Sequence, residues 1–168
     1  MMNLLNSLGL VVVPDFLNKS EEDNIISNIP VTKIIKGSTR NSIRRYGSNT
    51  PYKNQMISDA IPEYLDNIAL KIVNSGFLIN KPSSISINEY LPGNSIAPHI
   101  DSLESGPEIT IVSLLSDAIM VLALNNESHS VIVPARSLLQ LKHEIRYKWT
   151  HSIMPVEKKR YSIVFRNG

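Results

Sequence analysis

The sequence contains no cysteine among its 168 residues. This absence excludes disulfide bonds, thiolate zinc sites and cysteine nucleophiles, so any metal site must use histidine, aspartate or glutamate. The chain also lacks an apolar run of the roughly 18 residues that a membrane-spanning helix needs. Its N-terminal stretch "MMNLLNSLGLVVVPDF" has neither the charged start nor the cleavage site of a signal peptide. We therefore expect no membrane partner and an intracellular location, cytoplasmic or nuclear.

Repeats, low-complexity tracts and linkers are also lacking. The composition, 42% hydrophobic and 19% charged, is typical of a globular protein. A chain of this length suits one domain with a single core. We therefore predict one domain over residues 1–168, with helical support in 1–80 and a β core in 81–168, and we expect a monomer.

The first half of the chain predicts one strand and two helices. The stretch "LGLVVVPDF" reads as a strand that Pro14 ends. A helix follows in "NKSEEDNIISNI", with Ser20 as its expected N-cap and acidic residues in the first turn. The stretch "SDAIPEYLDNIALKIVNSG" has helical apolar spacing, with Ser58 as its expected cap and Gly76 at its end.

After Gly76 the apolar pattern changes to short runs. These are "SSISINEYL", "EITIVSLL", "AIMVLAL", "SVIVP", "RSLLQL" and "RYSIVFR", separated by proline, glycine, asparagine and serine. Such runs are typical of antiparallel strands in a sandwich or jelly roll. The predicted fold is mainly β with supporting helices, built on a double-stranded β-helix.

Only four histidines are present, and one lies two residues before an aspartate, as His99-Ile100-Asp101. In a strand these two side chains would point to the same side. Two histidines and a carboxylate form the ligand set of non-heme Fe(II) oxygenases. His151 is the preferred third ligand, because its alternation with buried Trp149 and Ile153 places it inside. His143 is the alternative, whereas His129 reads as a hairpin tip.

The last strand, "RYSIVFR", places Arg160, Ser162 and Arg166 on one face. An arginine that faces an interior needs an anion. The two arginine Cα atoms would lie roughly 20 Å apart in a strand. Side chains reaching inward from both ends could therefore hold a five-carbon dicarboxylate such as 2-oxoglutarate. Alternatively, this is an exposed edge strand with arginines in water.

Two further polar residues, Asn88 and Tyr90, share a face of the strand in "SISINEYLPGN", just upstream of the histidine–aspartate pair. They could hydrogen-bond a dicarboxylate in the same cavity. The alternative is an ordinary sheet with a polar outer face.

Charge is uneven along the chain. Residues 31–56 contain six basic residues and no acidic one, whereas residues 82–135 contain six acidic residues and no lysine or arginine. A basic segment is a candidate phosphate-binding surface, and a solvated loop is the alternative. The candidate nucleic-acid contacts are Arg40, Arg44, Arg45 and Lys53, with Tyr46 or Tyr52 as possible stacking partners for a base.

Along the chain the order is N-x-Y-x-P-G, H-x-D, a β-rich stretch, a histidine, and R-x-S-x-x-x-R. This order and the segments "NEYLPGNSIAPHID", "IVSLLSDAIMVL", "PARSLLQLKHEIRYKWTHSI" and "RYSIVFR" resemble the AlkB family of Fe(II)- and 2-oxoglutarate-dependent dioxygenases. The run "ARSLL…RYKWTHSI" is most similar to the homologues that modify the wobble uridine of tRNA.

The resemblance implies a role for each matching residue. The catalytic metal ligands would be His99, Asp101 and His151. The residues that hold 2-oxoglutarate would be Asn88, Tyr90, Arg160, Ser162 and Arg166. Arg160 would pair with the distal carboxylate, and Arg166 would lie near the end that chelates iron. Ser162 departs from the family, in which many members carry asparagine at this position.

The resemblance also implies Fe(II), 2-oxoglutarate and O₂ as cofactor and co-substrates, and single-stranded or flipped nucleic acid as partner. The expected reaction is oxidative demethylation or hydroxylation of a nucleobase. A protein side chain is the alternative substrate, and a catalytically silent binding module is a third reading. The substrate lid, between the two predicted helices, is shorter than in the relatives.

Overall fold

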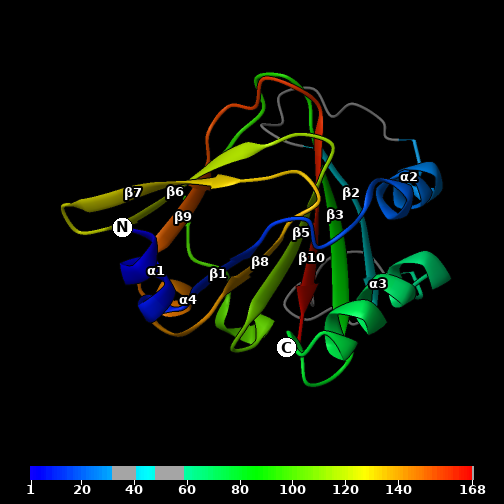
Figure 1. Ribbon diagram of the computed structural model, residues 1–168, viewed down its shortest axis with the longest axis horizontal. Helices are drawn as coiled ribbons and strands as arrows, with labels where there is room; N and C mark the ends of the chain where they lie inside the picture. Colours follow the sequence, from blue (N-terminus) through cyan, green and yellow to red (C-terminus); the bar gives the residue numbers. More distant parts are fainter. Residues whose placement is uncertain (32–40, 48–58, 168) are drawn as a thin grey trace.

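The computed structural model describes residues 1–31, 41–47 and 59–167, and within these it contains two facing antiparallel sheets (Figure 1). The larger sheet has six strands in the order β1-β8-β5-β10-β3-β2. Their bounds are β1 Leu10–Val13, β2 Asn41–Gly47, β3 Ser84–Tyr90, β5 Ile109–Leu114, β8 Leu138–Leu141 and β10 Arg160–Arg166.

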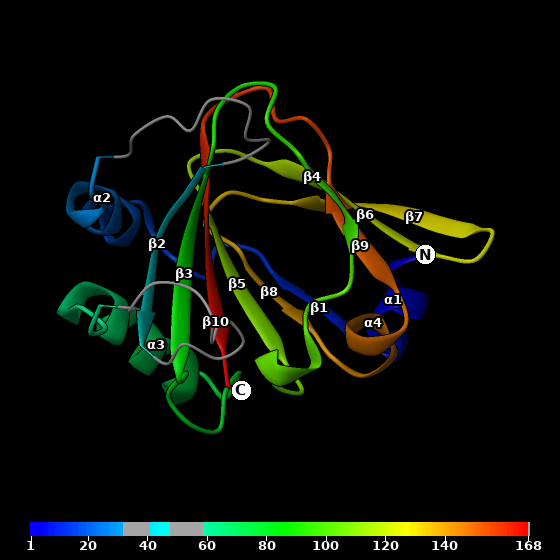
Figure 2. The same ribbon diagram turned by 180° about the vertical axis from the view of Figure 1, so that it is seen from behind.

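The smaller sheet has four strands in the order β4-β9-β6-β7, and Figure 2 shows it opposite the larger one. Its strands are β4 Ile96–His99, β6 Ala118–Leu124, β7 Glu127–Val133 and β9 Thr150–Ile153. Apolar side chains of both sheets, among them Ile111, Val164, Met120 and Leu122, meet in one buried cluster. The predicted jelly-roll fold, mainly β with supporting helices, is confirmed.

Helices cover the outer face of the larger sheet, where α2 (Lys19–Asn28) and α3 (Glu63–Asn74) pack against its strands (Figure 1). Alternate residues of β10 point to this side, so Ile163 and Phe165 join Leu65 of α3 in a second buried cluster. The intervening residues of β10 point to the other sheet. Strand alternation thus separates a structural face from a face that is available for a site.

Three short helical elements complete the described chain: α1 (Met2–Leu8), α4 (His143–Tyr147) and the 3₁₀ turn η1 (Leu103–Ser105). Helix α1 is not among the helices that the sequence pattern predicts. It ends at Gly9, whose φ of +111° places the turn in the left-handed region. A Cβ at this position would lie 2.1 Å from the Lys142 carbonyl oxygen, so only glycine allows this approach of the chain to the start of α4.

Two predicted helix starts are wrong. In α2 the N-cap is Asn18 rather than Ser20. The Asn18 side chain accepts a hydrogen bond from the backbone N–H of Glu21, and the Glu21 side chain accepts one from the backbone N–H of Asn18. In α3 the N-cap is Pro62, and Ser58 lies outside the described residues. The end predicted for α3 holds, because Gly76 follows its last turn with a φ of +79°. Among the described residues, no helix is both long and apolar enough to cross a membrane.

Replacing Asn18 by alanine is expected to lower the free energy of unfolding by about 1 kcal/mol, because the first turn of α2 loses its side-chain cap. Urea denaturation followed by circular dichroism measures the change. The matched control is Ser20→Ala, which removes an exposed hydroxyl one position inside the helix. An equal loss in both variants would contradict the assignment of the cap.

Candidate active site

A cavity of about 530 Å³ opens between the two sheets. Its walls come from the inward-facing residues of β3 and β10 on one side and from β4, β6 and β9 on the other. The polar side chains that line it are Asn88, Tyr90, His99, Asp101, Ser102, Ser105, His151, Arg160, Ser162 and Arg166. All eight predicted metal and 2-oxoglutarate residues therefore lie on one cavity.

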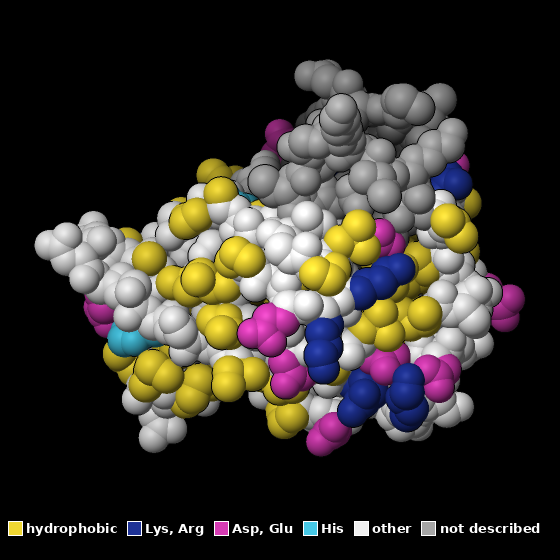
Figure 3. Space-filling view, turned by 90° about the horizontal axis from the view of Figure 1, so that it is seen from above, with side chains coloured by type: hydrophobic (Ala, Val, Ile, Leu, Met, Phe, Trp, Pro, Cys, Tyr) yellow, Lys and Arg dark blue, Asp and Glu magenta, His cyan; other side chains and the backbone are white. Residues whose placement is uncertain are grey.

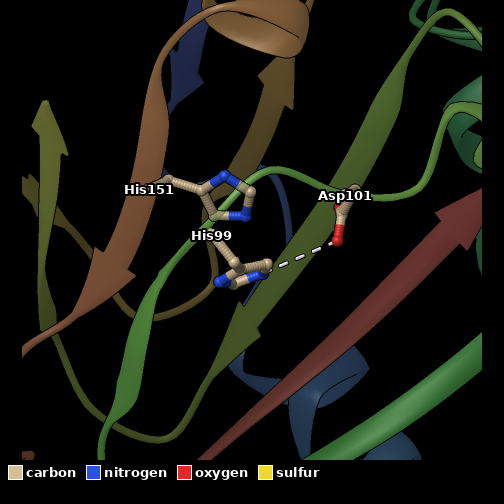
Figure 4. A group of neighbouring side chains, drawn as sticks. All are labelled: His99, Asp101 and His151. Atoms are coloured by element: carbon tan, nitrogen blue, oxygen red, sulfur yellow. Dashed lines mark ion pairs between the residues drawn. The ribbon is translucent and has the colours of Figure 1, made fainter. Parts of the chain in front are cut away.

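The three predicted metal ligands lie together on this cavity (Figure 4). One ligand atom from each of His99, Asp101 and His151 lies within 4.8 Å of the other two. Strand pairing causes this proximity, since His99 of β4 and His151 of β9 are directly opposite each other. Their ring centroids are 4.3 Å apart, and His99 Nε2 lies 3.6 Å from Asp101 Oδ1.

The hydrogen bond of His99 fixes which ring nitrogen can bind a metal. Its Nδ1 lies 2.8 Å from the Ala97 carbonyl oxygen, which can only accept a hydrogen bond. Nδ1 therefore carries the proton, and Nε2 keeps its lone pair on the side of Asp101. This arrangement is typical of metal-binding histidines, because the second hydrogen bond holds the ring in one orientation.

Asp101 reaches the site by a different route from the one predicted. Strand β4 ends at His99, so Asp101 lies in the loop that follows and not on the strand face. Burial is the strongest influence on its carboxyl group and favours the neutral form. The neighbouring His99 ring and the positive charge of Arg166 outweigh burial, so the pKa of Asp101 lies below its usual range.

His151 is buried on β9. Burial, followed by the neighbouring His99, lowers the pKa of His151 from 6.5 to about 4. At neutral pH the site therefore presents a carboxylate at Asp101 and an uncharged imidazole at His151. These are the protonation states that a divalent cation requires of its ligands.

Arg160 lies fully inside the cavity wall. Its Nε donates to the Ser113 hydroxyl at 2.9 Å, and its guanidinium lies 4.9 Å from the centroid of the Tyr90 ring. Its Nη1 has no hydrogen-bond partner among the described residues. A buried cation with a donor unused is costly unless an anion joins it. A carboxylate in the cavity would satisfy this requirement.

Arg166 faces the same cavity from the other end of β10. Its Nη1 donates to the Ser86 hydroxyl at 2.7 Å. Between the two arginines, the Asn88 amide lies 3.5 Å from the Ser162 hydroxyl, directly across the strand pair. The sequence did not point to Ser86 or Ser113, although each is a polar residue on the inward face of an apolar strand.

The two other histidines lie away from this cluster. His129 lies on β7, where its Nε2 is 2.6 Å from a Glu127 carboxylate oxygen and its ring packs near Trp149. His143 begins α4 and is exposed. Neither belongs to a group of metal-binding side chains within the described part of the chain.

The predicted nucleic-acid residues are only partly described, because Arg40, Lys53 and Tyr52 lie outside the described residues. Arg44 and Arg45 occupy successive positions of β2 and point to opposite faces. Arg44 forms an ion pair with Asp59 at 2.8 Å. Arg45 pairs with Ser86 in the strand register and therefore points to the cavity side of the sheet.

Tyr46 does not fit the predicted stacking role, because it is buried in the helix-covered core. On the face in Figure 3, lysine and arginine side chains lie next to acidic ones rather than in a separate basic patch among the coloured residues. A basic surface formed by the whole segment 31–56 therefore stays a prediction.

Comparisons with known proteins agree with this geometry. The model of the 2OG-Fe(II) oxygenase superfamily matches residues 9–166. The chain belongs to this superfamily. A tRNA (carboxymethyluridine(34)-5-O)-methyltransferase of Xenopus tropicalis is 31% identical to it over 88% of the chain. A DNA N6-methyl adenine demethylase of Caenorhabditis elegans is 25% identical over 95% of the chain.

The structure of OsALKBH1 shares the fold, with a TM-score of 0.69 at 16% identity over 94% of this chain and 97% of that one. This likeness shows the fold, and the family model with the sequence relatives shows a 2OG-Fe(II) oxygenase that is similar to AlkB homologues. The chain spans 25% of the Xenopus protein and 60% of the worm protein. Fe(II), 2-oxoglutarate and O₂ are the cofactor and co-substrates of this family, and the donor set of the cavity suits them.

The lowered pKa of His151 gives a direct test in the metal-free protein. Because burial disfavours the protonated ring, the imidazole should stay neutral as the pH falls from 7 and should protonate with a midpoint near pH 4. Titration of the imidazole signals by NMR, assigned with a His151→Asn variant, measures this midpoint. A midpoint at or above 6.5 would show that the ring is not held in the buried environment described here.

Proposed function

We propose that the chain is an Fe(II)- and 2-oxoglutarate-dependent dioxygenase that demethylates or hydroxylates a nucleobase in DNA or RNA. One observation carries the proposal: three metal-binding side chains and two buried arginines face the same cavity. The first group suits a divalent iron with open coordination positions, and the second suits a dicarboxylate beside it. Residues 1–168 would act as one oxygenase domain, as a monomer inside the cell.

The residue roles follow from the chemistry of the cavity. His99, Asp101 and His151 would hold the iron. Arg160 would bind the distal carboxylate of 2-oxoglutarate, because it is a buried cation whose Nη1 has no partner in the part of the chain that the structure describes. Arg166 would lie at the iron end, since its charge acts on both Asp101 and His151.

The remaining polar residues of the strand pair would hold the middle of the co-substrate. Tyr90 and Arg160 are cross-strand partners, as are Asn88 and Ser162. These four side chains form two polar pairs on one face of β3 and β10. Asn88, Tyr90 and Ser162 would supply hydrogen bonds, and Ser162 would do so with a shorter reach than the asparagine of many relatives.

When bound, iron and 2-oxoglutarate supply an oxidant that uses O₂ to hydroxylate a C–H bond, with release of succinate and CO₂. The residues of the chain hold both groups, orient them and keep the cavity poor in water. If the oxidised carbon is an N-methyl group, the hydroxymethyl product loses formaldehyde. A nucleobase would have to be unpaired or flipped to enter a cavity of this size.

A nucleic-acid substrate is supported by the two sequence relatives, whose names refer to a tRNA uridine and to DNA adenine. It is also supported by the position of Arg45, which points to the cavity side of the edge strand β2. Neither observation distinguishes RNA from DNA.

The decisive experiment incubates the protein with Fe(II), 2-oxoglutarate and methylated single-stranded RNA or DNA, and analyses the nucleosides by mass spectrometry. We expect loss of a methyl group, or addition of oxygen, in at least one nucleoside. The Asp101→Ala variant should abolish both this change and succinate formation, because two histidines alone hold the iron too weakly for turnover. Succinate formation without any change in either nucleic acid would instead favour a protein side chain as substrate.

The two arginines of β2 are expected to differ in nucleic-acid binding. Arg45→Ala should weaken binding of a single-stranded oligonucleotide and reduce the slope of log K against log salt concentration by about 1. Arg44→Ala is the matched control, because its guanidinium is held by Asp59 on the other face. Fluorescence anisotropy at several salt concentrations measures both, and a larger loss at Arg44 would contradict this orientation of the strand.

A further inference from the structure

Arg146 is a buried cation next to the proposed metal site that the roles above do not use. It lies on the short helix α4 and is only 2% exposed. A buried guanidinium is costly, and an apolar side chain of similar size often stabilises a fold as well or better. Its presence therefore calls for an explanation from its contacts.

All three guanidinium nitrogens of Arg146 donate to backbone carbonyls of one loop. Nη1 donates to the Asp101 carbonyl at 2.9 Å, Nη2 to the Ser102 carbonyl at 2.6 Å, and Nε to the Gly106 carbonyl at 3.1 Å. No carboxylate lies within ion-pair distance of Arg146 among the described residues. The planar fork of an arginine can hold several acceptors in a fixed arrangement, which a lysine cannot do.

This loop lacks the support that a strand would provide. The pairing of β4 with β9 ends at His99, so the backbone of Asp101 lies beyond the last ladder position. The apolar side chain of Leu103 in η1 does not anchor the loop, since it is 74% exposed. The guanidinium of Arg146 thus supplies backbone hydrogen bonds at the point where the sheet stops supplying them.

Arg146 also connects the loop to the segment that carries the third ligand. Helix α4 leads directly into β9, and His151 follows Arg146 by five residues. The start of α4 is itself fixed, because the Lys142 amide donates to the Gly9 carbonyl at 2.9 Å. Arg146 thus hydrogen-bonds the loop of Asp101 to the helix that precedes the strand of His151.

We propose that Arg146 is a positioning residue of the metal site, which holds the backbone of Asp101 so that its carboxylate lies within reach of a cation shared with His99 and His151. The inference rests on the proposed metal site and deepens it. Arg146 is not among the residues that line the cavity. It acts only through the Asp101 loop.

The test measures binding of Co(II) alone, followed by its visible absorption, in the absence of nucleic acid and 2-oxoglutarate. Arg146→Lys keeps the positive charge but loses the planar guanidinium that donates to three carbonyls. This variant should raise the Kd for Co(II) by about 10- to 100-fold. Arg146→Gln, which removes the charge and keeps two donors, should weaken binding in the same range and serves as the second variant if the lysine variant does not fold. Circular dichroism establishes folding before each titration.

The matched control is Lys148→Met, at the end of the same helix, where the side chain is 58% exposed and pairs with Glu144. Its Kd for Co(II) should equal that of the wild type. Folded Arg146 variants that bind Co(II) within twofold of the wild type would overturn the inference. Failure of the wild type to bind Co(II) would instead overturn the metal site itself.

A double-mutant cycle separates positioning from general support of the fold. In an Asp101→Ala background, Arg146→Lys should weaken Co(II) binding no further, because the residue through which it acts is gone. If Arg146→Lys causes its full loss of affinity in that background as well, Arg146 supports the fold in general and the inference is wrong.

Discussion

The site depends on the antiparallel pairing of β4 with β9. This pairing places His99 directly opposite His151, 52 positions apart in the chain, with ring centroids 4.3 Å apart. A one-residue slip in register would turn one imidazole to the far face of the sheet and remove a ligand. The buried side chains of the inter-sheet cluster favour this register. The apolar core and the proposed metal site therefore both require the same register of β4 with β9.

The two faces of the larger sheet lie in different environments, one against the helices and the other against the cavity. Along β10, Ile163 and Phe165 face the helices, while Arg160 and Arg166 face the cavity. Two guanidinium groups in an interior are costly, and Nη1 of Arg160 has no hydrogen-bond partner among the described residues. The fold therefore carries a positive charge in its interior that suits a dianionic co-substrate.

The sequence predicts the jelly roll and the residues that line the cavity well. Both depend on the alternation of side chains along each strand, which can be read from neighbouring residues in the sequence. It predicts Asp101 close to His99, as the structure has it, but on the wrong element: the strand ends at His99, and Arg146, distant in the chain, binds the loop that follows. The sequence predicts Ser20 as the cap of α2, whereas Asn18 and Glu21 form the capping box, because both Asn18 and Ser20 are residue types that cap helices. The opposite faces of Arg44 and Arg45 could not be foreseen, because the basic segment has no apolar alternation to reveal a strand. Helix α1 could not be foreseen either, because it is short and its end is fixed by a contact with the start of α4, which is distant in the chain.

The order of strands in the larger sheet has an evolutionary consequence. The strand that would grip the co-substrate, β10, lies in the interior of the sheet with a neighbour on each side, whereas β2, which carries Arg45, lies at the edge. Changes at an edge disturb one neighbour only, and changes at the centre disturb two. Under the proposed roles, substitutions in β2 could change the choice of target with less disturbance of the sheet than substitutions in β10 would cause.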